Sequence, residues 1–286
     1  MMDRAEILSK IKSVRPISVV VTRLMTLMDD PDISFTSVAD VVQYDPGLSA
    51  NMLKVVNSVK YGARSEIGSV RDALVRLGMK EVTRIVFVVS TRSTVDKPVE
   101  GYELNEGELW RRSVAVACAA EEIEKMLDSG MADVAFTAGL LHSIGKLVLA
   151  ESVRENITSI EKVAEENNIS FEEAEQDILG MDSCEAGALT LEQWSFPPQL
   201  VEAIRWHQGP DSAEEPDHLT DVVHIASAIA SMAGVGVGRD GLQHNASPGA
   251  MTRLGLKTID LEMVASKMMA NMTSILESFD DPKGGE

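Results

Sequence analysis

One glycine-rich hexapeptide near the carboxyl end of the chain has the spacing of a nucleotide-binding loop. Residues 236–241 read Gly-Val-Gly-Arg-Asp-Gly and match the G-x-G-x-x-G pattern literally. In a dinucleotide site this loop joins a strand to a helix, so that the helix N-terminus faces the pyrophosphate. Here the loop follows a predicted helix, and no strand–helix–strand unit surrounds it. We therefore interpret residues 236–241 as a flexible connection, and the sequence predicts no cofactor.

Cysteine and histidine side chains are the other groups that could do chemistry. Cys184 and His207 could pair as nucleophile and base, but the sequence names no third group to orient the base and no oxyanion donor. Cys118 lies on the apolar side of a predicted helix and is interpreted as a small buried hydrophobe. His224 precedes a buried helical run and is interpreted as a hydrogen-bonded core histidine.

The elements that position these residues have the signals of helices. Asp45 followed by Pro46 is typical of a helix start, Ser170 begins a capping-box pattern, and Gly78 is typical of a helix end. Residues 85–89 are rich in valine and alone would suit a buried strand, but their helical neighbours favour a helix. No segment shows sustained two-residue alternation, so the predicted fold class is all-α.

A break at residues 96–101, with a proline and a glycine, is the expected boundary between two helical lobes. The predicted domains are an N-terminal lobe of residues 1–98 and a second lobe of residues 99–279. Residues 280–286 are predicted to form a disordered tail.

Composition limits the classes of partner. The 286 residues include 26 basic and 45 acidic side chains, a formal charge of −19, and an acidic surface repels phosphate backbones. The sequence therefore predicts no nucleic-acid binding. The first residues lack the long apolar segment of a signal peptide, no apolar run approaches spanning length, and two isolated cysteines form no disulfide framework. We expect a cytoplasmic protein without membrane association.

The most informative stretch is residues 139–147, Gly-Leu-Leu-His-Ser-Ile-Gly-Lys-Leu. It resembles the motif of the HD superfamily of metal-dependent phosphohydrolases, in which an adjacent His-Asp pair ends a helix. A carboxylate and an imidazole together suit a divalent cation, which lowers the pKa of its bound water. Here His142 is present, but Ser143 stands where the resemblance implies an aspartate.

More of the chain, roughly residues 7–230, resembles one branch of that superfamily, the HDOD domain (HD-related output domain) of bacterial signalling proteins. Each matching element is short, but the elements occur in the family's order. They are Asp45-Pro46-Gly47-Leu48-Ser49; Asn57-Ser58 with Tyr61-Gly62; Ile67-Gly68-Ser69-Val70 with Ala73 and Leu77-Gly78; Leu109-Trp110 to Ala117; Glu185-Ala186-Gly187-Ala188; and Trp194, Pro197, Val201-Glu202-Ala203-Ile204 and His207.

The departures from the enzymes concern the metal ligands that the resemblance implies. Arg112 replaces a histidine after the tryptophan, Cys184 replaces a later histidine, and Ser227 replaces an aspartate, in addition to Ser143. His142 and His207 are retained. The implied set is therefore Arg112, His142, Ser143, Cys184, His207 and Ser227. This set has no carboxylate, and it includes a fixed cation that repels a divalent ion.

Three interpretations of this remnant remain open beside that of a packed, purely structural relic. Arg112 could occupy the old metal space and make a metal-free polar core. His142, Cys184 and His207 could instead hold zinc, which imidazole and thiolate suit. Arg112 and the two histidines could also bind a small anionic ligand. The prediction is that no metal is bound.

The resemblance implies a bacterial signal-transduction module that acts by contact with other signalling proteins and is not an enzyme. The chain has no room for a sensor or receiver domain, so a stand-alone output or adaptor role is expected. The alternatives are a divergent phosphohydrolase, which would need new carboxylates such as Asp133 or Asp221 near the histidines, and an anion sensor with Arg112 open to solvent. The sequence leaves open whether the chain forms a homodimer.

Overall fold

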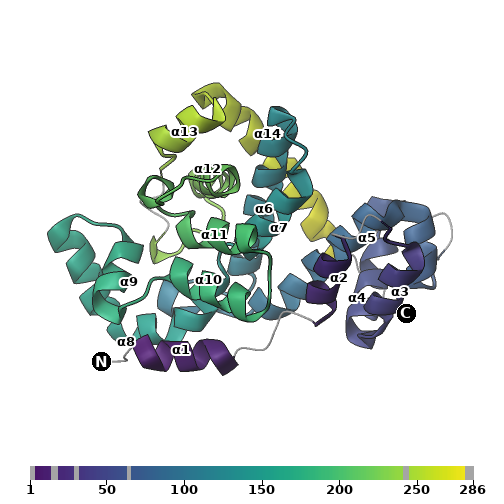
Figure 1. The fold of residues 1–286 in the computed structure, drawn as a ribbon, viewed down its shortest axis with the longest axis horizontal. Coiled ribbons are helices and arrows are strands. Elements are labelled where there is room, and N and C mark those ends of the chain that lie inside the picture. The colour runs from purple at the N-terminus through teal and green to yellow at the C-terminus, as the bar shows by residue number, and fades with distance from the viewer. Residues whose placement is uncertain (1–3, 14–18, 29–31, 63–65, 241–244, 281–286) are drawn as a thin grey trace. The chain divides into compact units, whose positions relative to one another are not determined.

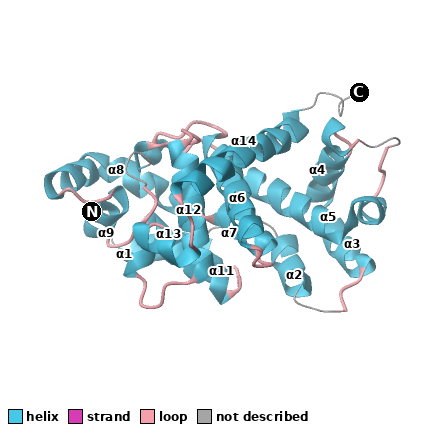
Figure 2. Cartoon of the chain, turned by 90° about the horizontal axis from the view of Figure 1, so that it is seen from above, coloured by secondary structure: helices cyan, strands magenta, loops and turns pink. Residues whose placement is uncertain are grey.

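The computed structural model describes residues 4–13, 19–28, 32–62, 66–240 and 245–280. These residues form helices and no β-strand, which confirms the all-α prediction (Figure 2). The helices are α1 (Arg4–Ser13), α2 (Val19–Met28), α3 (Phe35–Gln43), α4 (Pro46–Val56), α5 (Val70–Val95), α6 (Glu108–Leu127), α7 (Ala132–Leu141), α8 (Ile144–Asn167), α9 (Phe171–Leu179), α10 (Ser183–Gln193), α11 (Pro198–Trp206), α12 (His218–Met232), α13 (Pro248–Leu254) and α14 (Thr258–Asp280), with 3₁₀ turns η1 (Val59–Tyr61), η2 (Glu100–Tyr102) and η3 (Pro210–Ser212).

The chain groups into two compact units. One comprises residues 1–14 and 95–269, and the other comprises residues 15–94 and 270–286. The expected lobes, 1–98 and 99–279, are continuous in sequence, whereas these units are not. The difference at the amino end arises because α1 packs on α8 and α10 (Figure 1). Arg4 also donates to the carbonyl of Gly180 at 2.6 Å. The expected tail lies outside the described residues except for Asp280, which ends α14.

In the smaller unit, local signals act as predicted. Asp45 caps α4 by accepting a hydrogen bond from the backbone N–H of Leu48 at 2.9 Å, and Pro46 occupies the first helical position. Gly78 has φ +81° and interrupts the helical geometry of α5, which confirms the expected break. The valine-rich residues 85–89 lie within α5, so the helical interpretation of this run is also confirmed.

In the larger unit, α6 is the central helix, and α7 and α12 pack on it (Figure 1). Every residue from Arg112 to Glu124 is buried, as expected for a helix surrounded on all sides. Small side chains allow this packing. A Cβ on Gly139 would lie 2.7 Å from the Cα of Ala117, so α7 crosses α6 at a separation that only glycine permits.

The connection between α7 and α8 follows the sequence expectation closely. The sequence predicts a helix over about residues 131–142 with a bend near Gly145, and α7 spans residues 132–141, with Gly145 in the first turn of α8. A Cβ at Gly145 would collide with the backbone of Ser183 and Gly187 in α10. This close approach of α8 to α10 positions the end of α7, where His142 lies.

Residues 132–167, which contain α7 and α8, are long and apolar enough to cross a membrane by composition. The expectation that no apolar run approaches spanning length therefore holds for each helix taken alone but not for α7 and α8 together. In the fold 72% of the most apolar window is buried, as in the core helices of a globular unit.

Candidate functional site

His142 and Ser143 connect α7 to α8 and bond to each other. Nδ1 of His142 lies 2.7 Å from the carbonyl oxygen of Gly139, and Nε2 lies 2.7 Å from the hydroxyl oxygen of Ser143. Because a carbonyl only accepts, Nδ1 carries the proton and the hydroxyl donates to Nε2. Ser143 therefore occupies the lone pair with which His142 could bind a metal.

His207 has the same arrangement at the end of α11, where its Nδ1 donates to the carbonyl of Ile204 at 2.8 Å. The rings of His142 and His207 meet edge to face with centroids 5.5 Å apart, so the structure brings these two predicted residues together. The carbonyl of His207 accepts from Nδ1 of His224 at 2.8 Å, and Nε2 of His224 accepts from the backbone of Ser247 at 2.9 Å. The interpretation of His224 as a hydrogen-bonded core histidine is confirmed.

Burial determines the protonation of His142. Removal from water lowers its pKa well below 6.5, and the neighbouring His207 and Arg112 lower it further. His142 is therefore neutral at physiological pH and serves as a hydrogen-bonding group between two helices.

Arg112 is the largest fully buried side chain of the described residues, with an exposed fraction of 1%. Its guanidinium donates to the hydroxyls of Ser227 at 3.0 Å and Ser231 at 3.1 Å on α12, and to the carbonyl of Val235 at 3.3 Å. The structure thus joins two of the predicted site residues, Arg112 and Ser227. Ser231 was not anticipated, although its position one turn after Ser227 places both hydroxyls on one helix face.

The charge of Arg112 is only partly compensated. Burial lowers its pKa, while the more distant Asp240 and Glu172 raise it. Its hydrogen-bond partners within the described chain are two hydroxyls and a carbonyl, and its Nε–H has no acceptor there. The guanidinium therefore cross-links α6 and α12 as a cation whose hydrogen-bond acceptors in the described chain are neutral.

Cys184 lies in the first turn of α10 and is 3% exposed. Burial raises the pKa of its thiol well above the usual value, and the negative charges of Asp182 and Glu172 raise it further. The protonated thiol is a poor nucleophile. The described residues contain no group of three histidine, cysteine, aspartate or glutamate side chains placed to hold a metal.

The residues at this site do not fit a divalent metal. Arg112 supplies a positive charge, the lone pair of His142 is engaged by Ser143, and Ser227 is engaged by Arg112. Nor is the carboxylate of Asp221 directed to the histidines. It makes two hydrogen bonds of 2.7 Å with Arg253, the geometry of a forked ion pair.

A second buried polar cluster was missed by the sequence analysis. Lys146 forms an ion pair with Asp240, both almost fully buried, and its ammonium lies 5.3 Å from the ring centroid of Tyr102. Tyr102 in turn donates to Glu175 at 2.6 Å, and the backbone N–H of Ser183 donates to the other oxygen of Glu175 at 2.8 Å. Lys146 belongs to the quoted stretch 139–147 and Asp240 to the glycine-rich loop, and their spacing along the chain could not reveal this pairing.

The proton content of this cluster follows from its burial. Removal from water raises the pKa of Glu175 well above 4.5, and the nearby Glu172 raises it further, against the lowering effect of its hydrogen bonds. Glu175 therefore keeps its proton to a higher pH than an exposed glutamate does.

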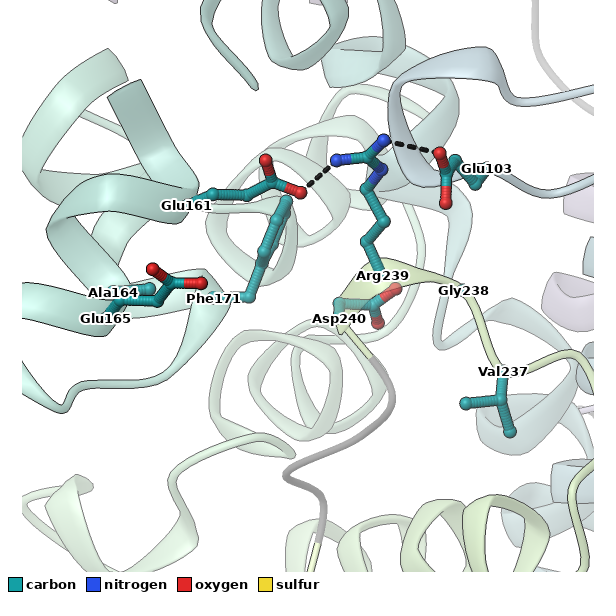
Figure 3. A pocket seen from close by; sticks show the side chains of 9 residues that line it. All are labelled: Glu103, Glu161, Ala164, Glu165, Phe171, Val237, Gly238, Arg239 and Asp240. Carbon is teal, nitrogen blue, oxygen red and sulfur yellow. Dashed lines mark hydrogen bonds and ion pairs between the residues drawn. The ribbon is translucent and has the colours of Figure 1, made fainter. Parts of the chain in front are cut away.

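Close to this cluster lies a pocket of about 640 Å³ (Figure 3). Phe171 forms one wall, and Arg239 from the glycine-rich loop extends between the carboxylates of Glu161 and Glu103, pairing with both. Its lining does not include Arg112, so this pocket is separate from the predicted site residues.

Comparison with known proteins is consistent with this helical core. The family model of the HDOD domain matches residues 14–210. A candidate phosphohydrolase of Shewanella amazonensis is 27% identical in sequence, with a TM-score of 0.71 over 96% of this chain and 97% of that chain. An HDOD domain protein of unknown function from Geobacter sulfurreducens is 22% identical, with a TM-score of 0.71 over 98% of this chain and 99% of that chain.

Some relatives are longer than this chain. An uncharacterized protein of Treponema pallidum is 20% identical over 225 residues, which are 78% of this chain, and this chain spans 43% of that protein. Because the family model covers more than half of the chain, and the motifs and the all-helical fold agree with it, the chain is a member of the HDOD domain family.

Proposed function

We propose that this protein is a non-catalytic HDOD output or adaptor module, which acts in bacterial signal transduction through contacts with other proteins. The observation that carries the proposal is the buried guanidinium of Arg112, hydrogen-bonded to Ser227 and Ser231 where the enzymes of the superfamily are expected to hold metal. A fixed cation there supports a metal-free polar core, since it opposes the binding of a divalent ion.

The hydrogen bond between Ser143 and His142 supports the same proposal, because it occupies the one histidine lone pair in the motif that could coordinate a metal. We further propose that the protein acts in the cytoplasm, binds neither nucleic acid nor membranes, and recognises signalling proteins. Its formal charge of −19 supports the exclusion of nucleic acid.

The test is metal content of the purified, untagged protein by plasma mass spectrometry, with thermal melts in the presence and absence of a chelator. We expect far less than one metal per chain and an unchanged melting temperature. One tightly held metal per chain, lost in His142→Ala and accompanied by a lower melting temperature after chelation, would overturn the proposal. Phosphomonoesterase and phosphodiesterase activity with added Mn²⁺ or Fe²⁺ would do the same, and would revive the phosphohydrolase alternative.

The adaptor role has its own test. In cells that express the tagged protein, cross-linking followed by affinity purification is expected to recover a signalling protein at a stoichiometric level. Recovery must be reproduced with the two purified components, because an acidic protein also collects basic contaminants. If no captured candidate binds in that purified assay, the adaptor role is contradicted and the anion-sensor alternative remains.

A further inference from the structure

Val235 and Gly236, at the start of the glycine-rich loop, lie against Arg112. The carbonyl of Val235 accepts from Arg112 at 3.3 Å. Gly236 has φ +56°, and a Cβ there would lie 2.7 Å from the Cβ of Arg112 and 2.8 Å from the carbonyl of Glu108. Only glycine permits this approach, so the loop lies against α6 at the base of the Arg112 side chain, while its Val235 carbonyl meets the guanidinium.

Two neighbouring side chains fasten the end of this loop to different partners. Asp240 forms the buried ion pair with Lys146 at the start of α8. Arg239 extends instead to Glu161 on α8 and to Glu103 after η2, in the half-exposed pocket (Figure 3). The ion pair of Asp240 is shielded from solvent. The ion pairs of Arg239 are exposed, so salt or a competing charged group weakens them.

The guanidinium of Arg112 is incompletely compensated where it is buried. Arg112 is fully buried, it bonds to neutral oxygens, and its Nε–H lacks an acceptor among the described residues. A buried cation without a hydrogen-bonded counter-ion and with an unsatisfied donor calls for a physical explanation, because either feature alone is costly. An oxyanion would satisfy both the charge and the free donor.

We infer that residues 235–240 form a strap that closes the Arg112 site, and that lifting the strap uncovers a binding site for an oxyanion such as a phosphoryl or carboxylate group. The inference rests on the proposed function, since it requires that no metal occupies this core. The exposed ion pairs of Arg239 act as the releasable fastening, and Arg112 is the group that receives the ligand.

The strap is tested by the rate at which phenylglyoxal modifies Arg112, measured by peptide mapping of the full-length protein. Gly236→Ala should wedge the strap away from Arg112 and raise the rate at least tenfold. Gly234→Ala is the matched control, because Gly234 has a similar φ of +70° but no atom within 4 Å of an added Cβ. The control should leave Arg112 as protected as it is in the unmodified protein.

A surface variant keeps the test valid if Gly236→Ala does not fold. Arg239→Ala should raise the rate several-fold, and added salt should do so in the unmodified protein. Arg154→Ala, which removes an exposed ion pair with Glu100 in the same unit, should not. Equal rates in all variants would overturn the inference. So would faster labelling that appears only together with reactivity of the buried thiols Cys118 and Cys184, because the whole core would then be opening.

The ligand class is tested with inorganic phosphate and acetate added to Gly236→Ala or Arg239→Ala. Protection of Arg112 by both anions would indicate a general oxyanion site, and protection by phosphate alone would indicate a phosphoryl ligand. Protection by neither would overturn the ligand part of the inference. Failure of the proposed function is distinguished from these outcomes by the metal analysis, which does not depend on the strap.

Discussion

His142 is held in one neutral tautomer by two hydrogen bonds, from its Nδ1 to Gly139 and from Ser143 to its Nε2. Both ring nitrogens of His142 therefore have a hydrogen-bond partner, as they would if one nitrogen bound a metal and the other a backbone carbonyl. Under the proposed function, Ser143 at the position of the implied aspartate supplies a hydrogen-bond donor instead of a metal ligand.

The protonation of His142 predicts how stability depends on pH. Because its folded pKa lies well below 6.5, the unfolded chain takes up a proton first as the pH falls. The contribution of His142 is complete above pH 6.5 and is lost as the pH falls from there toward the folded pKa, by up to about 1.4 kcal/mol per pH unit. In ¹⁵N NMR spectra the His142 ring should remain in the Nδ1–H form from pH 8 to pH 5.5. A ring that titrates near pH 6.5 would contradict this assignment.

Arg112 predicts a different type of effect. Arg112→Ala should lower the free energy of unfolding by about 2–4 kcal/mol, because it leaves a cavity and deprives Ser227 and Ser231 of their donor. Arg112→Met should cost less, since a similar apolar volume replaces a poorly compensated cation. Urea denaturation measures both values. The control is Arg111→Ala on the exposed side of the same helix, and a cost as small as this control's would contradict a structural role for Arg112.

At the scale of elements, the buried cluster around Glu175 connects α9 to η2 and to the start of α10. Burial raises the pKa of this carboxyl group well above the ordinary value of 4.5, so the folded chain holds its proton to higher pH than the unfolded chain does. The contribution of this group to stability is therefore complete at low pH and is lost as the pH rises from that value through the folded pKa.

Glu175→Gln removes this titration while keeping groups that can bond to Tyr102 and Ser183. The variant should gain stability relative to the unmodified protein as the pH is raised from 5 to 8, by about 1 kcal/mol or more, measured by urea denaturation at both values. Asp177→Asn, on the exposed side of α9, should show no such trend. A difference between Glu175→Gln and the unmodified protein that is the same at pH 5 and pH 8 would mean that Glu175 is ionised in the fold.

Asp221, a carboxylate that a phosphohydrolase would need near the histidines, instead links two helices. Asp221 is buried on α12 and is bound by Arg253 from α13, with both bonds at 2.7 Å. The ion pair holds α13 against α12. The position of Asp221 is therefore explained by packing between two helices.

At the scale of the whole molecule, the charge distribution predicts weak association with nucleic acid. With a formal charge of −19, the protein should repel the phosphate backbone at every orientation that lacks a basic patch. Fluorescence anisotropy with a labelled random duplex should show no binding at about 150 mM salt and micromolar protein. Saturable binding that weakens with salt would reveal a local basic surface and would contradict the prediction.

The sequence by itself determined most of the local structure and the family. The caps at Asp45 and Ser170 and the break at Gly78 each depend on residues within one helical turn, so their outcome is encoded locally. The order of short motifs along the chain was sufficient to indicate the HDOD family, which the family model then showed. The six predicted site residues follow from their positions relative to those motifs, and their role as a former metal site stays a prediction.

Only the tertiary structure decided what these residues contact. Arg112 and Ser227 are 115 positions apart, and Lys146 and Asp240 are 94 positions apart. Pairings at such separations depend on how the helices pack, which small residues such as Gly139 and Gly145 control through close approach. The glycine-rich loop shows the same limit. Its glycines indicate conformational freedom in the sequence, whereas in the fold Gly236 is needed because Arg112 lies beneath it.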